Sequence, residues 1–239
     1  MYISLMLLNF ISRLFYFIGS EMRLVFVKYC LINLFLFFCA TNCHAEQVDG
    51  LFGSTEYKSS ELSAFKKWAS LRARHQNDLN KTHKPVNVRC RRTKNFKCVS
   101  EEWREMIDGL KKGSDIKKLT VINEHLNRSP YITDMINWQQ NDYWATIRQF
   151  FDKDGDCEDY AIAKYYSLIE VGFRPDQMRI AVVHDKNLDV AHAVLAVYLE
   201  DKVWILDNQI SNIVMENNVI HYQPLYSINE QAWWLHKSS

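Results

Sequence analysis

The stretch Gly155-Asp-Cys-Glu-Asp-Tyr-Ala-Ile-Ala-Lys164 places a single cysteine among acidic residues at the point where a helical pattern begins. Apolar residues recur at three-to-four spacing from Ala161 to Ile169, and Gly172 ends the pattern. Amide groups in the first turn of a helix have no partner within the helix, and the helix dipole favours negative charge there. A cysteine in that position is therefore stabilised as a thiolate, which makes Cys157 the candidate nucleophile.

A cysteine nucleophile needs an imidazole to accept its proton and a third group to orient that imidazole. The runs 192–199 and 202–207 are rich in β-branched and aromatic residues, and the polar pair between them predicts a hairpin. His192 starts the first run and Asp207 ends the second, so the hairpin brings them side by side. A cysteine on a helix end that faces such a pair is the papain-like arrangement.

Alternatives to this triad remain at this stage. His184 is the alternative to His192 as the proton acceptor. It is less favoured because no carboxylate is predicted beside it on a neighbouring strand. Each residue also has a purely structural explanation. Cys157 can be a small buried hydrophobic residue, His192 a hydrogen-bonded histidine of the core, and Asp207 the cap of a turn. These explanations remain because spacing in a sequence proves no contact in space. The chain has no His-Glu-x-x-His, Gly-x-Ser-x-Gly, phosphate-binding glycine loop or Cys-x-x-Cys, so nothing supports a metalloprotease, serine hydrolase or nucleotide enzyme.

Five carboxylates lie within a few residues of Cys157: Asp152, Asp154, Asp156, Glu158 and Asp159. Without a counter-charge they raise the pKa of the thiol. Oxygen ligands at this density suit Ca²⁺, although the spacing is not that of an EF-hand. The alternative is a solvated acidic turn.

The fold class predicted from the hydrophobic pattern is α+β. Three helices precede the one at Cys157: one capped by Ser60, one opening at Ser100, and one over 116–126 that ends at Ser129-Pro130. Strands follow over 179–184, 192–199 and 202–207. Since no repeat, Pro-rich linker or low-complexity tract interrupts residues 46–239, they form a single domain.

Residues 1–45 have the composition of a targeting segment. A basic start at Met22-Arg23, the apolar run Cys30–Cys39 and the small-residue end Cys43-His44-Ala45 are typical of a secretory signal peptide. Met22 is an alternative start that leaves residues 1–21 untranslated, and a retained membrane anchor is the alternative to cleavage. Without this segment the chain has 26 basic and 27 acidic residues, a balance that excludes a polybasic nucleic-acid binder.

Three of the six cysteines leave with the signal peptide, and the exported form keeps Cys90, Cys98 and Cys157. In an oxidising compartment we expect Cys90 and Cys98 to pair across a short basic loop and to leave Cys157 as the free thiol. The alternative is that both are ordinary free thiols, because spacing alone does not fix pairing.

Four segments carry a resemblance to a known family: Asn141-Asp-Tyr-Trp-Ala-Thr146, Gly155–Lys164, Ala191-His192 and Leu206-Asp207-Asn208. Together they resemble the bacterial transglutaminase-like cysteine proteinases of the LapG type, over about residues 119–234. The resemblance implies a papain-like, transglutaminase-like fold with a helical amino-terminal part packed on an antiparallel sheet. It also implies catalysis by Cys157, His192 and Asp207.

The resemblance further implies a periplasmic cysteine endopeptidase that cuts a large surface adhesin near its amino end, at a small-residue, Ala-Ala-like site, and so promotes biofilm dispersal. It implies Ca²⁺ dependence, with Asp156 and Glu158 matching the family's metal carboxylates and Asp159 as a third candidate ligand. The implied partner is an inner-membrane cyclic-di-GMP receptor that sequesters the enzyme.

The chain departs from the family's pattern at Ile147, where the family usually has Pro, and the stretch from Cys90 to Cys98 has no counterpart that we can align. Two other functions remain as alternatives. One is a transglutaminase that transfers the acyl group to an amine on the same fold. The other is a non-catalytic, calcium-dependent binding module.

The exported protein should begin at or near Glu46, because Cys43-His44-Ala45 fits signal-peptidase processing. Mass spectrometry of the protein recovered from the periplasm measures this directly. A mature chain found in membranes and still containing Cys30–Cys39 would contradict the prediction and support the anchor.

Overall fold

The computed structural model describes residues 50–80 and 99–238, all of which belong to one compact unit, residues 49–239. The signal peptide over 1–45 and the disulfide between Cys90 and Cys98 lie outside the described residues and stay predictions. Among the residues that are described, no helix is long and apolar enough to cross a membrane.

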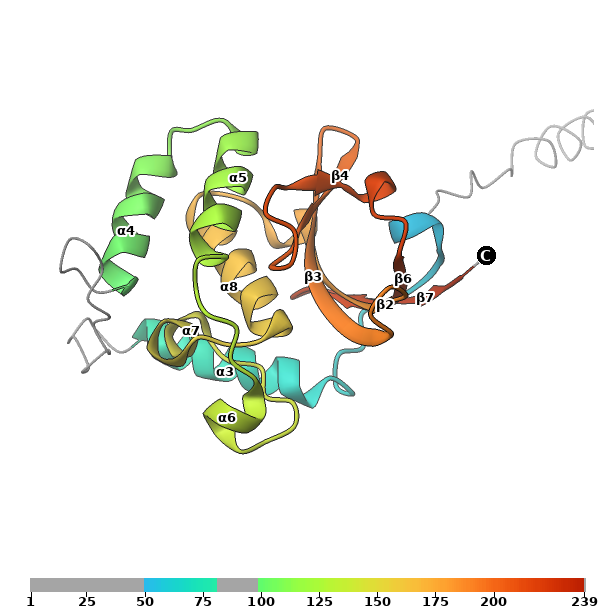
Figure 1. The fold of residues 1–239 in the computed structure, drawn as a ribbon, viewed down its shortest axis with the longest axis horizontal. Helices are drawn as coiled ribbons and strands as arrows, with labels where there is room; N and C mark the ends of the chain where they lie inside the picture. Colours follow the sequence, from blue (N-terminus) through green and yellow to red (C-terminus); the bar gives the residue numbers. More distant parts are fainter. Residues whose placement is uncertain (1–49, 81–98, 239) are drawn as a thin grey trace, which may run out of the picture. The chain divides into compact units, whose positions relative to one another are not determined.

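Within the described part, seven strands form one antiparallel sheet in the order β1-β7-β6-β2-β3-β4-β5 (Figure 1). Each strand therefore pairs only with antiparallel neighbours, as expected from the sequence. The strands are β1 (Thr55–Ser59), β2 (Met178–Asp185), β3 (Val190–Leu199), β4 (Lys202–Leu206), β5 (Val214–Met215), β6 (Tyr222–Ile228) and β7 (Trp233–Lys237).

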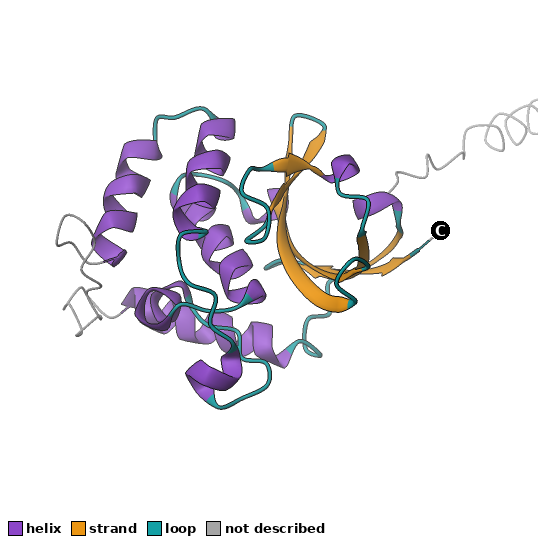
Figure 2. Ribbon diagram, viewed as in Figure 1, coloured by secondary structure: helices purple, strands orange, loops and turns teal. Residues whose placement is uncertain are grey.

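The α-helices gather on one side of the sheet, which curves away from them (Figure 2). They are α3 (Lys66–Asn80), α4 (Val99–Leu110), α5 (Asp115–Leu126), α6 (Asp134–Trp138), α7 (Ile147–Lys153) and α8 (Cys157–Glu170). Three short 3₁₀ helices complete the described elements: η1 (Leu51–Gly53), η2 (Pro175–Gln177) and η3 (Glu216–Asn218).

Two hydrophobic cores lie on opposite faces of the sheet. Strand β3 shows the alternation: Leu195 and Val197 face the large core formed with the helices, whereas Val194 and Ala196 face a smaller core on the other side. The smaller core is closed by Leu51 of η1 and by Val219 after η3. Because both faces of β3 are buried, its sequence is nearly continuously apolar.

Helix α8 is the centre of the large core, since residues 159–168 are all buried. It packs against β3 on one side and against α5 and α7 on others. A helix buried all round needs apolar residues on every face, which its middle supplies. The rigid setting of α8 fixes the position of its first residue, Cys157.

The structure confirms the helix at Cys157, the hairpin between β3 and β4, and the helices near Ser100 and over 116–126. The predicted cap at Ser60 is wrong. Strand β1 pairs with β7 as far as Ser59, and the helix starts only at Lys66. Leu62 and Phe65 pack on the core from the turn between β1 and α3. Because their spacing continues the apolar pattern of the helix, the sequence predicted a helix that begins too early.

Helix α7 forms although Ile147 replaces the proline that the family usually has. Ile147 is the first residue of the helix, a position that proline favours because its amide needs no partner there. Here the side chain of Thr146 accepts a hydrogen bond from the amide of Gln149, and the side chain of Gln149 accepts one from the amide of Thr146. This capping box satisfies two amides at the start of α7 without a proline.

Lys164 is fully buried in the middle of α8, and its Nζ has no hydrogen-bond partner in the described structure. The ring of Tyr160 lies 5.8 Å from Nζ. Burial lowers the pKa of Lys164 to about 7, and the negative charge of Asp207, directly after β4, acts in the opposite direction. The amine is thus a buried polar group that lowers the stability of the fold.

Lys164→Met should raise the melting temperature most at about pH 6, and the gain should shrink toward about pH 10. The unfolded chain keeps the lysine proton up to pH 10.5, whereas the folded protein releases it near 7, so the stability of the wild type rises across that window. Calorimetry over this pH range measures the difference. Lys112→Met, at an exposed turn after α4, is the control. A gain in melting temperature that does not change with pH would contradict the lowered pKa of Lys164.

Candidate active site

Cys157 is the first residue of α8, and a close backbone approach fixes the turn before it. A Cβ at Gly155 would lie 2.4 Å from Cβ of Asp159, so only glycine fits. The thiol is partly exposed and free. Its S–H donates a hydrogen bond to Glu158 Oε2 at 3.2 Å.

His192 and Asp207 form a buried hydrogen-bonded pair, with His192 Nε2 2.9 Å from Asp207 Oδ1. His192 is on β3, and Asp207 follows the last residue of β4. Two further groups hold the carboxylate: the amide of Gln209 donates to Oδ1 at 2.8 Å, and the hydroxyl of Tyr222 donates to Oδ2 at 2.6 Å. The carboxylate can therefore fix the orientation of the imidazole.

The structure packs α8, which begins at Cys157, against β3, the strand that carries His192. The last β3–β4 pair is Leu195↔Leu206, so His192 lies beyond the end of that ladder. With Nε2 of His192 engaged by Asp207, Nδ1 is the nitrogen left to take a proton. The side-chain nitrogen Nε2 of Gln209 lies 3.5 Å from it. The pair of His192 and Asp207 thus lies where β3 and β4 separate, and β3 is the strand against which the helix of Cys157 packs.

The rival imidazole has a different setting. His184 Nε2 lies 3.2 Å from Asp189 Oδ1, and Asp189 is almost fully exposed in the turn between β2 and β3. A surface pair of this kind holds an imidazole loosely compared with the buried pair of His192 and Asp207.

Charges around the site act against ionisation of the thiol and in favour of ionised Asp207. Burial raises the pKa of Cys157 well above its usual range, and the charges of Glu158 and Asp156 raise it further; the amide of Ala193 lowers it. For Asp207, burial acts to raise the pKa, but the hydrogen bond and charge of His192 and the hydrogen bonds from Tyr222 and Gln209 outweigh it and lower the pKa. A nucleophile here needs positive charge nearby.

A cluster of carboxylates surrounds the first turn of α8. Oxygens of Asp134, Asp156 and Asp159 lie within 4.8 Å of one another, and so do oxygens of Asp134, Asp142 and Glu158. We call these five residues the acidic cluster. Asp156 and Asp159 were expected from the sequence to share a site, and Glu158 meets them through Asp134. Asp152, on α7, belongs to neither group.

Several oxygens of the acidic cluster are buried without a hydrogen-bond partner in the described structure: Asp134 Oδ1, Asp156 Oδ1 and Asp159 Oδ2. The second oxygen of the same carboxylate does accept a hydrogen bond in two cases. Asp156 Oδ2 accepts one from the backbone N–H of Asp134 at 3.1 Å, and Asp159 Oδ1 accepts one from the backbone N–H of Ala145 at 2.7 Å. Buried carboxylate oxygens are normally satisfied. Unsatisfied oxygens that converge from several segments fit a hard cation such as Ca²⁺, which takes oxygen ligands in a flexible geometry.

The pKa values of the cluster agree with this fit. Burial raises the pKa of Asp134 to about 6 and that of Glu158 to about 8, and repulsion from Asp156 adds to both. The pKa of Asp159 is raised well above its usual range by the same causes. Carboxyl groups that repel one another in a buried place are stabilised by a cation bound among them.

Sequence analysis missed Asp134, Asp142 and Tyr222. Asp142 was within the quoted segment 141–146, and its acidic side chain was a usable signal. Asp134 lies 22 residues before Asp156, and no spacing rule links them. Tyr222 reaches Asp207 from β6, which pairs with β2, so only the strand order reveals it.

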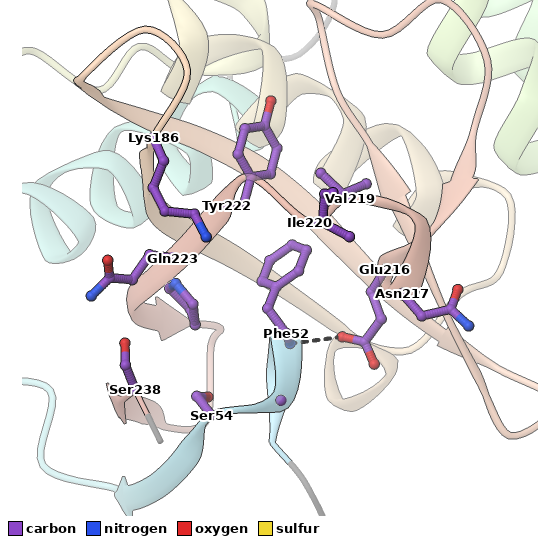
Figure 3. A pocket seen from close by; sticks show the side chains of 12 residues that line it. Phe52, Ser54, Lys186, Glu216, Asn217, Val219, Ile220, Tyr222, Gln223 and Ser238 are labelled. Carbon is purple, nitrogen blue, oxygen red and sulfur yellow. Dashed lines mark hydrogen bonds between the residues drawn. The ribbon is translucent and has the colours of Figure 1, made fainter.

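A separate cavity of about 500 Å³ lies on the other side of Tyr222 (Figure 3). Phe52 stands in it, edge to face with Tyr222 at 6.0 Å, and the amide of Phe52 donates to Glu216 at 3.0 Å. Lys186 contributes an amine to the same lining. The cavity does not include Cys157, so it is not the place of the candidate chemistry.

Comparisons with known proteins identify the family. The family model described as bacterial transglutaminase-like cysteine proteinase matches residues 78–236. The structure is similar to calcium-bound LapG of Legionella pneumophila, with 34% identity over 68% of this chain and 89% of that one and a TM-score of 0.54. It is also similar to EGTA-treated LapG of the same organism, with 32% identity over 75% of this chain and 89% of that one and a TM-score of 0.55.

No curated protein matches the chain. The family model covers more than half of the residues, and the similar structures cover two thirds or more of this chain at 32–34% identity. The chain therefore belongs to the bacterial transglutaminase-like cysteine proteinases and has their transglutaminase-like fold.

Proposed function

We propose that this chain is a calcium-dependent cysteine endopeptidase of the periplasm. Its substrate is the amino-terminal region of a large surface adhesin, which it cuts at a small-residue, Ala-Ala-like site, so that the adhesin is released and the biofilm disperses. An inner-membrane cyclic-di-GMP receptor controls it by sequestration. The substrate, the compartment and the receptor rest on the family resemblance, and the predicted signal peptide supports export.

The observation that carries the proposed chemistry is the buried, hydrogen-bonded pair of His192 and Asp207 on the sheet against which α8, the helix that begins at Cys157, is packed. His192 takes the thiol proton at Nδ1, and the thiolate attacks the carbonyl carbon of the scissile bond. The π electron pair moves to the carbonyl oxygen. As the C–N bond breaks, His192 returns the proton to the leaving amine, and water then hydrolyses the thioester with His192 as base.

The other residues of the site act on His192 and on Cys157. Asp207, held by Tyr222 and Gln209, keeps the imidazole oriented and stabilises its protonated form. Oxygens of the acidic cluster would hold Ca²⁺, which supplies the positive charge that offsets the carboxylates beside the thiol. Asp156 and Glu158 flank Cys157 directly, so their position fixes the helix start as well as the local charge.

Cys157→Ala and His192→Ala should each abolish cleavage while the melting temperature stays close to that of the wild type. Asp207→Asn should lower kcat by about 100-fold or more, yet less than Cys157→Ala, because surrounding groups partly replace an orienting residue. The measurement incubates the exported form with adhesin amino-terminal fragments and determines product masses. His184→Ala, the matched control, should retain activity.

Product masses also separate the alternatives. Hydrolysis gives two fragments whose masses sum to the substrate plus one water, whereas acyl transfer gives crosslinked or amine-modified products. A Cys157→Ala variant that keeps the full activity would contradict catalysis by this thiol and favour the binding module. Loss of cleavage in His184→Ala but not in His192→Ala would show that the wrong imidazole was chosen.

Chelation should abolish activity, and Ca²⁺ should restore it better than Mg²⁺, which demands a tighter octahedral site. A site filled at 100 times its Kd should stabilise the wild type by about 2.7 kcal/mol. Asp156→Ala, Glu158→Ala and Asp134→Ala should lose this gain, because each contributes an oxygen to the cluster. Calorimetry with and without Ca²⁺ measures it, and Asp152→Ala should behave like the wild type. Full activity in excess chelator would contradict the calcium site.

A further inference from the structure

The chain between α5 and α6 is bonded to the start of α8. The hydroxyl of Tyr160, on α8, donates a hydrogen bond to the carbonyl of Ser129. Three residues later the backbone N–H of Ile132 donates to the carbonyl of Gly155 at 2.9 Å, in the turn before α8. We call residues 127–132 the connecting segment. It is thus held both by the helix of the nucleophile and by the turn that leads into this helix.

Asn127, the first residue of the connecting segment, contacts the other half of the site. Its side-chain nitrogen Nδ2 donates to the backbone carbonyl of Asp207 at 2.7 Å and lies 3.4 Å from the backbone carbonyl of Ile210. Both of these groups are acceptors, so the amide presents its NH₂ group to them. Its oxygen, Oδ1, is buried without a hydrogen-bond partner in the described structure. The donor end therefore decides how this side chain is placed.

The two carbonyl groups that Asn127 contacts belong to the turn 207–210, which carries the carboxylate of the site. Within this turn the backbone N–H of Gln209 donates to Asp207 Oδ1 at 2.8 Å, and the same oxygen lies 2.9 Å from His192 Nε2. One oxygen thus closes the turn and faces the imidazole. The direction of the carboxylate therefore depends on the backbone of this turn, which Asn127 holds from outside.

The connecting segment is too short and too stiff for its two ends to move independently. It has six residues, and the ring of Pro130 fixes its own φ and restricts the backbone of Ser129 before it. Helix α5, which ends at Leu126, packs against α8. A shift of Asn127 relative to α8 would therefore strain the bonds at the other end of the segment.

We propose that Asn127 is a positioning residue of the active site. It holds Asp207, and through Asp207 the imidazole of His192, in a fixed place relative to the helix start that carries Cys157. The proposal rests on the proposed function, in which His192 receives the thiol proton and Asp207 keeps the imidazole oriented. Asn127 does not touch the substrate, and no proton moves through it, since its amide stays a donor in every step.

Two variants separate the donor from the volume of the side chain. Asn127→Leu keeps the size and removes the N–H donor, whereas Asn127→Ala removes both. If the donor positions Asp207, both variants should lose about tenfold or more in kcat with the adhesin fragment, while KM changes by less than about threefold. The proton NMR signal of the hydrogen bond between His192 and Asp207, assigned by its loss in His192→Ala, should shift or broaden in both variants.

Asn123→Ala is the matched control. The side-chain amide of Asn123 reaches the same loop from α5, but it donates to the carbonyl of Ser211 at 3.1 Å, beyond the turn of Asp207. This variant should keep kcat within about threefold of the wild type and leave the NMR signal in place.

Four results would overturn the role of Asn127. They are wild-type kcat in both Asn127 variants, a loss in Asn127→Ala alone, a lower kcat with an unmoved NMR signal, and equal losses in Asn123→Ala. A loss in Asn127→Ala alone would mean that the side chain only fills space. If the wild type does not cleave, the proposed function falls, and the NMR signal by itself decides whether Asn127 holds Asp207.

Discussion

Mutual repulsion among the buried carboxylates at the start of α8 is the constraint on which the site depends. The acidic cluster brings together side chains from α6, from the segment between α6 and α7, and from the turn and first residues of α8. In water such groups would stay apart and solvated, but here several of their oxygens are buried without a partner. The same charges face Cys157 and raise the pKa of its thiol. A cation in the cluster would relieve both effects at once, which couples the shape of the helix start to the reactivity of the nucleophile.

The sheet supplies the other half of the site. The β3–β4 hairpin carries His192 and Asp207 to the same end. The ladder stops at Leu195↔Leu206, which leaves His192 beyond it on the strand against which α8 packs. Tyr222 on β6 then fixes Asp207 from the far side of β2. The central sheet and the buried α8 are rigid elements, so the three groups meet through packing between helix and strand.

Features close in the chain were predictable, and those that depend on distant pairing were not. The pair of His192 and Asp207 followed from one hairpin, and Cys157 from one helix start. The strand before α3 was missed because Thr55–Ser59 pairs with β7, about 180 residues away, and its sequence has no clear alternation. Asp134 was not predicted because its backbone N–H donates to Asp156 across 22 residues, and only the folded chain brings the two together. The approach of Cys157 to β3 was a hypothesis from the need of a cysteine nucleophile for an imidazole and from the family resemblance, since no local pattern reports how a helix docks on a sheet.

The most direct test of this account is the rate at which iodoacetamide alkylates Cys157 at neutral pH, measured on the peptide that contains it, with saturating Ca²⁺ and with excess chelator. If a bound cation offsets the acidic cluster, the thiolate fraction rises, and each unit by which the pKa falls gives about a tenfold faster reaction. We therefore expect at least about tenfold faster alkylation with Ca²⁺ than with chelator, and no such difference in Glu158→Ala. Equal rates in a protein shown by calorimetry to bind Ca²⁺ would contradict the account.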